Sequence, residues 1–288
     1  MKDYLTIKEF SKLSGIEPTT LRYWDDIGLF SPAKRGEDNK YRYYSPQQMI
    51  TINFINVLSN LEIQLKTISE MEDRTPSLIL RLIRKHERVL DQEMRKLQES
   101  YSVIHTRESL INFGMEVIKG FYVKDGVRVL NDSSKEGCSF VSVDTVTLLN
   151  REEMPYILGP ANDFSGKESF YGVFMNFCKK AEELSINLNF PIGAIHTSMD
   201  SFLESPSNPD YFISLDPSGN RKSGAASYLC AFEYGYYGDF KKLPERMAVY
   251  AKENQLKLKG PVYTIYLLDE ISVKDPSEYL VQVAIEVE

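Results

Sequence analysis

The chain has 288 residues, 42% of them apolar, and a net charge of −7; it is longer than most single domains and has enough apolar residues for at least two hydrophobic cores. It contains no apolar run of the roughly 18 residues that a membrane helix needs, and its start, Met1-Lys2-Asp3-Tyr4, lacks the apolar stretch of a signal peptide, so we expect a soluble cytoplasmic protein without a membrane partner. The three cysteines, Cys138, Cys178 and Cys230, are far apart and have no histidine cluster near them, which indicates neither a disulfide framework nor a zinc site.

Two short helices joined by a tight turn are predicted near the amino terminus. The first stops at Gly15, because glycine readily takes the positive φ that ends a helix, and the second opens with Pro18 at a first helical position. Apolar residues at helical spacing define the inner face of the pair: Leu5, Ile7, Phe10, Leu13, Leu21, Trp24 and Ile27. This pattern is typical of a helix-turn-helix unit that binds DNA.

The second helix is expected to enter the major groove, and the basic, aromatic segment after it is expected to form a wing. Arg22 suits either a phosphate or a guanine, because its planar guanidinium donates two parallel hydrogen bonds. For an isolated arginine, an ion pair with Asp25 or Asp26 is the more common arrangement, but the cations and tyrosines of the wing favour DNA. The side chains expected to contact DNA are Thr19, Arg22, Tyr23, Trp24, Lys34, Lys40, Tyr41, Arg42 and Tyr43.

Residues 4–72 resemble the DNA-binding domain of the MerR family. The recognition helix of that family reads Leu-Arg-Tyr-Tyr-Glu/Asp-x-x-Gly-Leu and its wing contains Tyr-Arg-x-Tyr; here these segments are Leu21 to Leu29 and Tyr41 to Tyr44. Trp24 stands where the family usually has tyrosine. Acidic residues slightly outnumber basic ones in residues 1–76, so affinity for DNA has to come from locally placed cations and from dimerisation.

A single long helix is predicted between residues 77 and 118, where a seven-residue spacing of apolar side chains is typical of a coiled coil. The positions expected to form the dimer seam are Ile83, Leu90, Leu97, Ile104 and Ile111, with Leu80, Met94, Tyr101 and Met115 at the companion position. Glu87 and Glu108 interrupt the seam, and packing of the helix on its own chain is the alternative. The MerR resemblance implies an antiparallel coiled coil in a homodimer.

From about residue 121 the predicted elements repeat. The first set is a strand at Ser139–Leu149, a helix at 168–185, and strands at Pro191–Phe202 and Tyr211–Leu215. The second set is a strand at Ser227–Tyr237, a helix at Leu243–Asn254, and strands at Val262–Leu268 and Tyr279–Val287. A strand-helix-strand-strand unit used twice predicts a small α+β domain with a pseudo-twofold axis and a cleft between the repeats.

The segment from Lys259 to Leu267 resembles the Gly-Pro-x-Tyr-Glu-x-Tyr signature of GyrI-like effector-binding domains, which form the sensing half of BmrR-like regulators. Thr264 stands where such sensors have a buried glutamate for cations, so the expected ligand is neutral or is held by aromatic stacking. Glu233 either replaces that carboxylate or faces solvent. The side chains expected at the effector are Tyr228, Glu233, Phe240, Thr264, Tyr266 and Tyr279.

The predicted organisation is therefore a winged helix-turn-helix at 1–76, a dimerisation helix at 77–120 and a GyrI-like domain at 121–288, in the α+β class. By resemblance, this is a multidrug-sensing transcription regulator whose partners are double-stranded promoter DNA, a small-molecule effector and RNA polymerase, and effector binding distorts the promoter. Two alternatives are a hydrolase of a small electrophile and a repressor controlled by a protein partner. No catalytic residues, metal or cofactor are expected.

Overall fold

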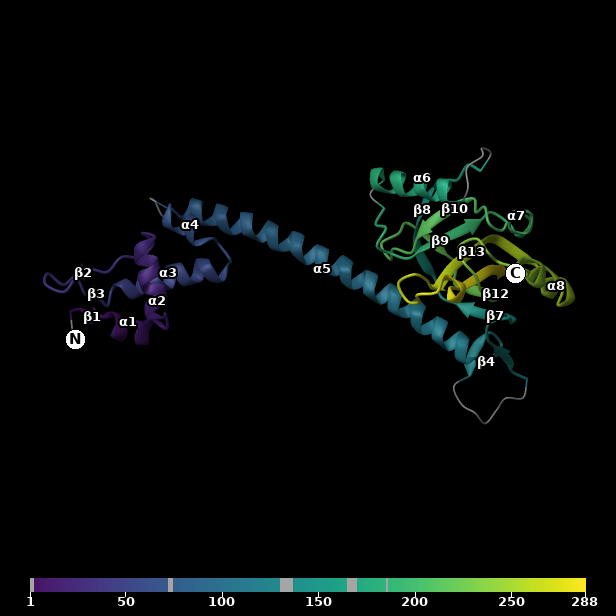
Figure 1. Ribbon diagram of the computed structural model, residues 1–288, viewed down its shortest axis with the longest axis horizontal. Helices are drawn as coiled ribbons and strands as arrows, with labels where there is room; N and C mark the ends of the chain where they lie inside the picture. The colour runs from purple at the N-terminus through teal and green to yellow at the C-terminus, as the bar shows by residue number, and fades with distance from the viewer. Residues whose placement is uncertain (1–2, 72–74, 130–136, 165–169, 185) are drawn as a thin grey trace. The chain divides into compact units, whose positions relative to one another are not determined.

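The computed structural model describes residues 3–71, 75–129, 137–164, 170–184 and 186–288 (Figure 1). These form two compact units, Met1–Leu97 and Gln98–Glu288, which are described separately below. Helices and strands are mixed in both units, which confirms the α+β class.

The first unit contains a helix-turn-helix followed by a two-stranded wing. Its elements are β1 (Leu5–Thr6), α1 (Ile7–Ser14), α2 (Pro18–Asp26), β2 (Lys34–Arg35), β3 (Arg42–Tyr44), α3 (Gln48–Asn60) and α4 (Leu65–Ser69). Thr6 caps α1 by accepting a hydrogen bond from the Glu9 backbone N–H, and α1 ends at Gly15, which has a φ of 73°. The wing strands join β1 in a small sheet ordered β1-β3-β2.

Aromatic stacking fixes the wing to the helices of the first unit. Tyr44, at the end of β3, is fully buried and stacks on Phe10 of α1, with ring centroids 4.8 Å apart, and on Phe30, at 5.6 Å. Leu21 and Trp24 of α2 enter the same core. Helix α2 therefore turns its apolar side inward and its polar side outward, as the helical spacing predicts.

Helix α5 (Pro76–Lys119) is continuous over 44 residues. Leu97 and Ile104 of the predicted seam are 71% and 62% exposed in the single chain, so this apolar stripe is not covered by its own chain. Ile111 differs, because it packs against the core of the second unit. At Gly114 the helix approaches β13 (Leu258–Leu268) so closely that a Cβ atom would lie 3.1 Å from the Leu268 side chain.

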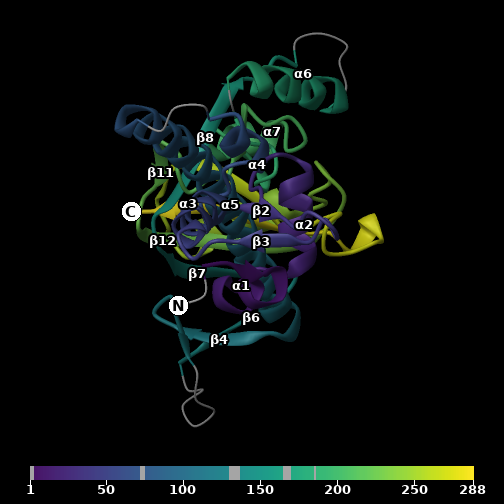
Figure 2. The ribbon, with the colours of Figure 1, turned by 90° about the vertical axis from the view of Figure 1, so that its left-hand side faces the viewer.

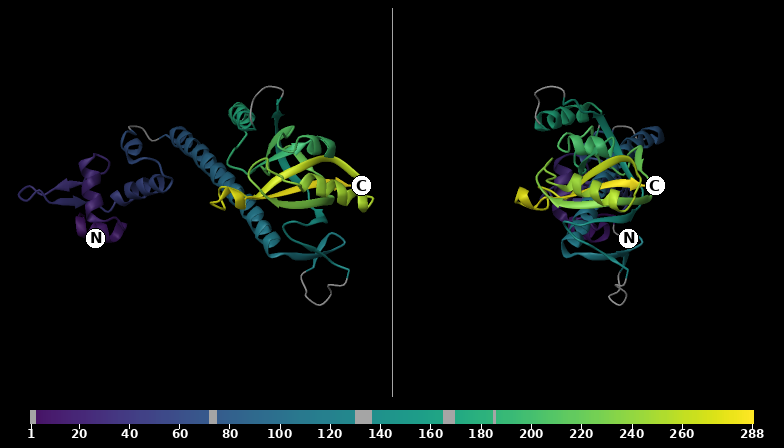
Figure 3. Two further views of the ribbon diagram at one scale, coloured as in Figure 1. Left: turned by 45° about the vertical axis from the view of Figure 1, so that its right-hand side comes forward. Right: turned by 90° about the vertical axis from the view of Figure 1, so that its right-hand side faces the viewer.

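The described part of the second unit contains a large sheet, a small sheet, the carboxy-terminal part of α5 and further helices. The small sheet is ordered β5-β4-β6, from β4 (Phe121–Lys124), β5 (Val127–Val129) and β6 (Ser139–Val141). The strands of the large sheet besides β13 are β7 (Val146–Arg151), β8 (Met154–Ala161), β9 (Ile192–His196), β10 (Tyr211–Ser214), β11 (Arg221–Ser223), β12 (Ala226–Tyr234) and β14 (Leu280–Val287). Its helices are α6 (Phe170–Glu183), α7 (Met199–Glu204) and α8 (Leu243–Glu253), with a short helical turn, η1, at Pro276–Glu278. Helix α6 and the small sheet lie at opposite ends of the large sheet (Figures 2 and 3).

The large sheet confirms the repeat of a strand-helix-strand-strand unit. Its order is β11-β8-β10-β9-β13-β14-β12-β7, so the unit β8-α6-β9-β10 is mirrored by β12-α8-β13-β14. The two repeats meet where β9 pairs antiparallel with β13, with Ala194 opposite Thr264. A cleft between the repeats therefore has to lie over this pair of strands.

Two predicted strands of the first repeat are wrong in detail. The predicted strand at Ser139–Leu149 is broken into β6 and β7 by a turn at Asp144, which has a φ of 70°, and the first strand of the repeat is instead β8. The strand predicted at Pro191–Phe202 ends at His196, because Ser198 caps α7. Of the helix predicted at 168–185, residues 170–183 form α6, and residues 168, 169 and 185 lie outside the described residues.

Alternate residues of β13 face opposite sides of the large sheet. Tyr263 and Ile265 pack with Val117 of α5, whereas Val262 and Tyr266 pack with Met247 of α8. Helix α6 covers the same side as α8, next to the first repeat. Thr264 therefore faces the side that carries both repeat helices.

Candidate functional site

The outer side of α2 carries the polar residues expected to contact DNA. Thr19, Arg22 and Tyr23 are exposed, and so are Lys40 and Tyr41 in the wing. Among the described residues, Arg22 forms no ion pair, so its guanidinium is available to phosphate or a base edge. Trp24 is 5% exposed within the core, and we correct the expectation of a DNA contact there.

The wing is tied to the recognition helix by buried charge. Asp25 accepts from the Arg42 Nε at 2.6 Å and from the Arg35 Nη2 at 2.5 Å, and Arg42 also reaches Asp26 at 3.3 Å. Burial by itself raises the pKa of Asp25, but the hydrogen bonds and charges of the two arginines outweigh it, so the pKa lies below its ordinary value. Asp25 and Asp26, the partners in the alternative ion pair of Arg22, are thus bound by the wing arginines, and Arg42 holds the wing against α2.

Lys34 is held against aromatic rings of the same unit. Its ammonium lies 4.6 Å from the centre of the Tyr4 ring and 5.9 Å from that of Tyr43. Lys34 lies in β2 and is exposed.

A cavity of about 520 Å³ lies in the second unit, over the strands where the repeats meet. Its lining comes from α6, from β9 and β13, and from the loops that follow β12 and β13. The lining residues are Arg107, Phe170, Tyr171, Phe174, Met175, Cys178, Leu188, Phe190, Ile192, Gly193, Ala194, His196, Pro206, Ser207, Pro209, Phe212, Tyr236, Tyr237, Gly238, Phe240, Thr264, Tyr266, Asp269, Glu270 and Tyr279. Such a volume and an apolar lining are typical of small-molecule sites.

Aromatic rings form two walls of this cavity, which meet where the ring centroids of Tyr171 on α6 and Tyr236 lie 6.3 Å apart. On the α6 side, Phe170 and Phe174 lie 5.7 and 5.3 Å from Phe212, both in edge-to-face geometry. On the other side four tyrosines form a cluster, in which the rings of Tyr237 and Tyr266 lie 4.5 Å apart. The other two members of this tyrosine cluster are Tyr236 and Tyr279, whose rings are 5.7 Å apart. The walls can stack on a flat ligand or attract a cation to a ring face.

The floor of the cavity contains two polar side chains. The Thr264 hydroxyl donates to the Ala194 carbonyl across the strand pair, at 3.4 Å. His196 is fully buried, and neither of its ring nitrogens is accessible from the cavity. Burial lowers the pKa of His196 to about 4, against the opposing effects of the Asp210 charge and of a hydrogen bond with the Pro206 backbone.

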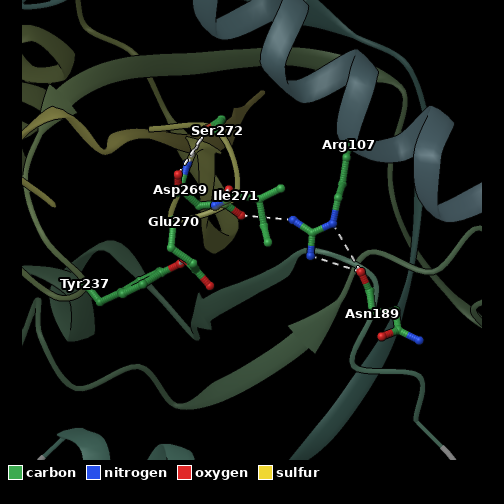
Figure 4. A network of polar contacts seen from close by, with 7 residues as sticks. All are labelled: Arg107, Asn189, Tyr237, Asp269, Glu270, Ile271 and Ser272. Carbon is green, nitrogen blue, oxygen red and sulfur yellow. Dashed lines mark hydrogen bonds and ion pairs between the residues drawn. The ribbon is translucent and has the colours of Figure 1, made fainter. Parts of the chain in front are cut away.

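A polar network closes one end of the cavity (Figure 4). Arg107 of α5 donates from Nη1 to Asp269 at 3.1 Å and from Nη2 to the Asn189 carbonyl at 3.0 Å. Asp269 also accepts from the Ile271 backbone N–H, so its carboxylate is fully engaged. Glu270, beside it, accepts a hydrogen bond from the Tyr237 hydroxyl, and burial together with this bond raises the pKa of Tyr237. This end thus holds one cation and two carboxylates.

Four of the six expected effector residues line the cavity: Phe240, Thr264, Tyr266 and Tyr279. The other two do not, and we correct them. Tyr228 lies on the α5 side of the sheet, where its hydroxyl donates to the Gly224 carbonyl. Glu233 is buried and ion-paired with Lys241 at 3.1 Å and Arg246 at 3.0 Å, so it neither faces solvent nor replaces the carboxylate missing at Thr264.

Sequence reasoning missed the residues that the loops and α6 contribute. Tyr236 and Tyr237 were placed on a strand that in fact ends at Tyr234, and Glu270 follows β13 directly. The sequence does contain a signal for these residues. Loops at the ends of neighbouring strands lie close together and often carry binding residues, and these two loops carry two tyrosines and two carboxylates. The position of His196 inside the cavity had no signal in the sequence.

Comparisons with known proteins agree with this architecture. Residues 5–75 match the family described as "MerR HTH family regulatory protein". The multidrug-efflux transporter 2 regulator of Bacillus subtilis is 24% identical over 283 residues, which are 95% of this chain and 92% of that protein. The multidrug-efflux transporter 1 regulator of the same organism is 23% identical over 99% of both chains. The heavy metal-dependent transcription regulator 2 of Rhizobium meliloti is 30% identical over 101 residues, which are 33% of this chain and 68% of that protein.

The chain belongs to the MerR family and is a ligand-responsive, DNA-binding transcription regulator. As a member of that family it acts on promoter DNA as a dimer, with a small-molecule effector. Within the described residues, no group of three or more His, Cys, Asp or Glu side chains is placed to hold a metal ion. None of the helices described is long and apolar enough to span a membrane.

Proposed function

We propose that this regulator is of the multidrug type and that the cavity between its repeats binds a small, lipophilic, aromatic effector. The observation that carries this proposal is the lining of the 520 Å³ cavity, in which two walls of aromatic rings adjoin a floor that contains Thr264 and His196. Effector binding would change the geometry of promoter DNA so that RNA polymerase can use it, with DNA deformation as the step that costs free energy. The proposed location is the cytoplasm.

The proposed DNA surface consists of Thr19, Arg22 and Tyr23 on α2, with Lys34, Lys40, Tyr41 and Tyr43 in the wing. Its support is the exposure of the α2 residues and the lack of an ion pair at Arg22 among the described residues. The proposed domains remain 1–76, 77–120 and 121–288. The proposed dimer seam is Ile83, Leu90, Leu97 and Ile104, whose side chains are all exposed in the single chain.

The charges at the end of the cavity favour a cationic effector, which revises the expectation of a neutral one. Arg107 offsets Asp269, while the Glu270 carboxylate receives only the neutral hydroxyl of Tyr237 among the described groups. The excess negative charge therefore lies at Glu270, beside the tyrosine cluster. A cation bound there gains both the carboxylate and the ring faces.

Fluorescence titration of the full-length protein with N-methylquinolinium and with methylnaphthalene tests this proposal, because the two have nearly the same shape and differ in charge. We expect the cation to bind about tenfold more tightly, and Glu270→Gln to remove that preference while methylnaphthalene binds as before. Glu253→Gln, an exposed glutamate at the end of α8, is the matched control. Failure of both compounds to bind contradicts the aromatic-effector assignment, and equal binding of both contradicts the role of Glu270.

No observation favours the hydrolase alternative. The Thr264 hydroxyl is committed to Ala194, and Glu233 lies outside the cavity and is held by two cations. A general base has to reach the substrate, and neither of these two residues does; Glu270, which lines the cavity, accepts a hydrogen bond from the Tyr237 hydroxyl. We therefore propose that the cavity binds its ligand without converting it, which is consistent with relatives that are named as regulators.

A further inference from the structure

The two repeats of the second unit contribute different chemistry to the effector cavity. The first repeat contributes apolar rings, from Phe170 and Phe174 on α6 and from Phe212 on β10. No aspartate, glutamate, lysine or arginine lines the cavity from the described residues between β8 and β10. The second repeat contributes the tyrosine cluster and the carboxylates of Asp269 and Glu270. One half of the cavity is therefore apolar and uncharged, and the other is polar and acidic.

The apolar half forms a separate surface on α6, which we call the phenylalanine subsite: Phe170, Phe174, Met175 and Phe212. The Phe170 and Phe174 rings are stacked with their centroids 6.5 Å apart, and Met175 beside them is 56% exposed. Cys178, one turn further along α6, also lines the cavity, and burial raises the pKa of its thiol, so it is uncharged at neutral pH. A cation that enters this subsite loses its hydration without gaining a carboxylate.

The polar half has its hydroxyl groups engaged within its own loops. The Tyr266 hydroxyl donates to the Tyr236 carbonyl at 3.0 Å and accepts from the Gly238 backbone N–H at 3.3 Å. The Tyr237 hydroxyl donates to Glu270. What this half offers a ligand is therefore the ring faces and the negative charge of Glu270, which together suit a flat cation.

The cavity is too large for one bicyclic aromatic compound. Its volume is about 520 Å³, whereas an apolar cavity of roughly 150 Å³ already holds a benzene molecule. A bicyclic cation at the tyrosine cluster and Glu270 therefore leaves room for a second group of similar size. The remaining space adjoins the phenylalanine subsite.

We propose that the phenylalanine subsite is a second binding site, which takes a neutral aromatic group while a flat cation occupies the tyrosine cluster and Glu270. The natural effector is then a two-part molecule that joins such a cation to such a neutral group. This inference rests on the proposed function, because it assumes that the cavity binds the effector. Joining the two parts makes the second contact intramolecular, which raises affinity without a new contact.

Equilibrium dialysis of the full-length protein with N-methylquinolinium and methylnaphthalene together tests whether both subsites fill at once. We expect one molecule of each to bind per chain, and saturating cation to change the Kd of methylnaphthalene by less than about threefold. A Kd of methylnaphthalene that rises in proportion to the cation concentration would show that the two compounds share one site, and would overturn the proposal.

Substitutions in the phenylalanine subsite locate the neutral group. Phe174→Gln and Met175→Gln should each weaken methylnaphthalene at least threefold and leave N-methylquinolinium within about twofold, whereas Glu270→Gln should do the converse. Val249→Gln is the matched control, because Val249 on α8 is 54% exposed and does not line the cavity. Met175 is at the surface, so its variant stays informative should Phe174→Gln be unstable. Equal weakening of both compounds, or of neither, contradicts the second subsite.

Linked compounds, in which a naphthyl group is joined to the quinolinium nitrogen by alkyl chains of increasing length, test the two-part effector. The best of them should bind at least tenfold more tightly than N-methylquinolinium, and Phe174→Gln and Met175→Gln should each remove part of that gain. If neither parent compound binds, the proposed function itself fails. If the cation binds but methylnaphthalene does not, or if no linked compound gains affinity, the proposed function stands and the second subsite is wrong.

Discussion

At the scale of single residues, Asp25 joins two parts of the first unit, the recognition helix and the wing. Its side chain is 3% exposed and receives hydrogen bonds from two arginines of the wing, so the recognition helix and the wing share one buried charge cluster. Removing one partner of such a cluster leaves charge unpaired, which is more costly than replacing the whole cluster. The sequence offers Arg42 as a phosphate contact, but the structure uses it to hold the wing.

Asp25→Asn is therefore expected to lower the free energy of unfolding by about 3 kcal/mol. Asp26→Asn is the control, because Asp26 is 67% exposed and forms only the longer contact of 3.3 Å with Arg42. We expect this control to change stability by less than about 0.5 kcal/mol. Urea unfolding of both variants measures the difference, and equal stability of the two would contradict the bracing role.

The buried imidazole of His196 should make the free energy of unfolding depend on pH, which can be measured without a ligand. Its pKa is about 4 in the folded protein and 6.5 when unperturbed, so between these values the unfolded chain binds a proton that the folded chain does not. Stability must then fall as the pH drops from 6.5 towards 4, by roughly 2–3 kcal/mol for this group. The negative charge of Asp210 raises the pKa of His196 and so opposes the effect of burial.

Unfolding of the wild type and of His196→Gln, measured at pH 7 and at pH 4.5, isolates that contribution. The variant should gain stability relative to the wild type at the lower pH. A constant difference between the two proteins would mean that the imidazole is not neutral and buried in solution.

At the scale of elements, the sequence predicts those helices and strands whose ends and buried faces are set by neighbouring residues in the chain. Gly15 and Pro18 bound the first two helices as expected, and the seven-residue repeat marked one uninterrupted helix from Pro76 to Lys119. The doubled strand-helix-strand-strand unit was also legible in the sequence, because alternation and helical spacing are properties of each segment.

Features that depend on contacts between distant segments were not predictable in this way. The turn at Asp144 splits one expected strand, and the strand that replaces it, β8, is recognisable only from its pairing with β10. The cavity is assembled from α5, α6, several strands and the loops between them, so Tyr237 and Glu270 meet although they are 33 positions apart in the chain. Glu233 was a reasonable candidate by residue type, but Lys241 and Arg246 neutralise it.

The exposed stripe of α5 leads to a prediction about the dimer. Leu97→Lys places a charge in the middle of the apolar seam, so light scattering should report monomers or aggregates, with little DNA binding. Gln98→Lys adds the same charge one residue off the seam and should leave the dimer intact. A dimer of Leu97→Lys as stable as that of Gln98→Lys would show that the seam lies elsewhere.

The same helix is linked to the effector cavity through Arg107 (Figure 4), which bonds to both loops at the end of the cavity. Arg107→Gln removes the charge that joins α5 to Asp269, so a ligand that moves these loops should no longer bias the helix. We expect this variant to bind DNA within about threefold of the wild type and to bind N-methylquinolinium more tightly, because Asp269 loses its cation, but to lose most of the effect of one ligand on the other. Gel-shift titrations with and without the ligand measure that coupling, and an unchanged coupling would exclude Arg107 as the link.

At the scale of the whole molecule, the chain joins a DNA-binding unit to a ligand-binding unit through one helix that contains residues of both. Regulation by an effector requires that the two binding events share a free energy of coupling, which is reciprocal by thermodynamic necessity. A ligand that binds the cavity but has equal affinity for both states of the dimer would regulate nothing.

The most direct test of the account is resonance energy transfer between dyes at the two ends of operator DNA, selected from a random pool by the protein itself. Saturating N-methylquinolinium should change the transfer efficiency on DNA bound by the wild type, and should leave it unchanged for Arg107→Gln. Transfer that does not respond to a ligand shown to occupy the cavity of the DNA-bound wild type would contradict the claim that this pocket controls the geometry of DNA.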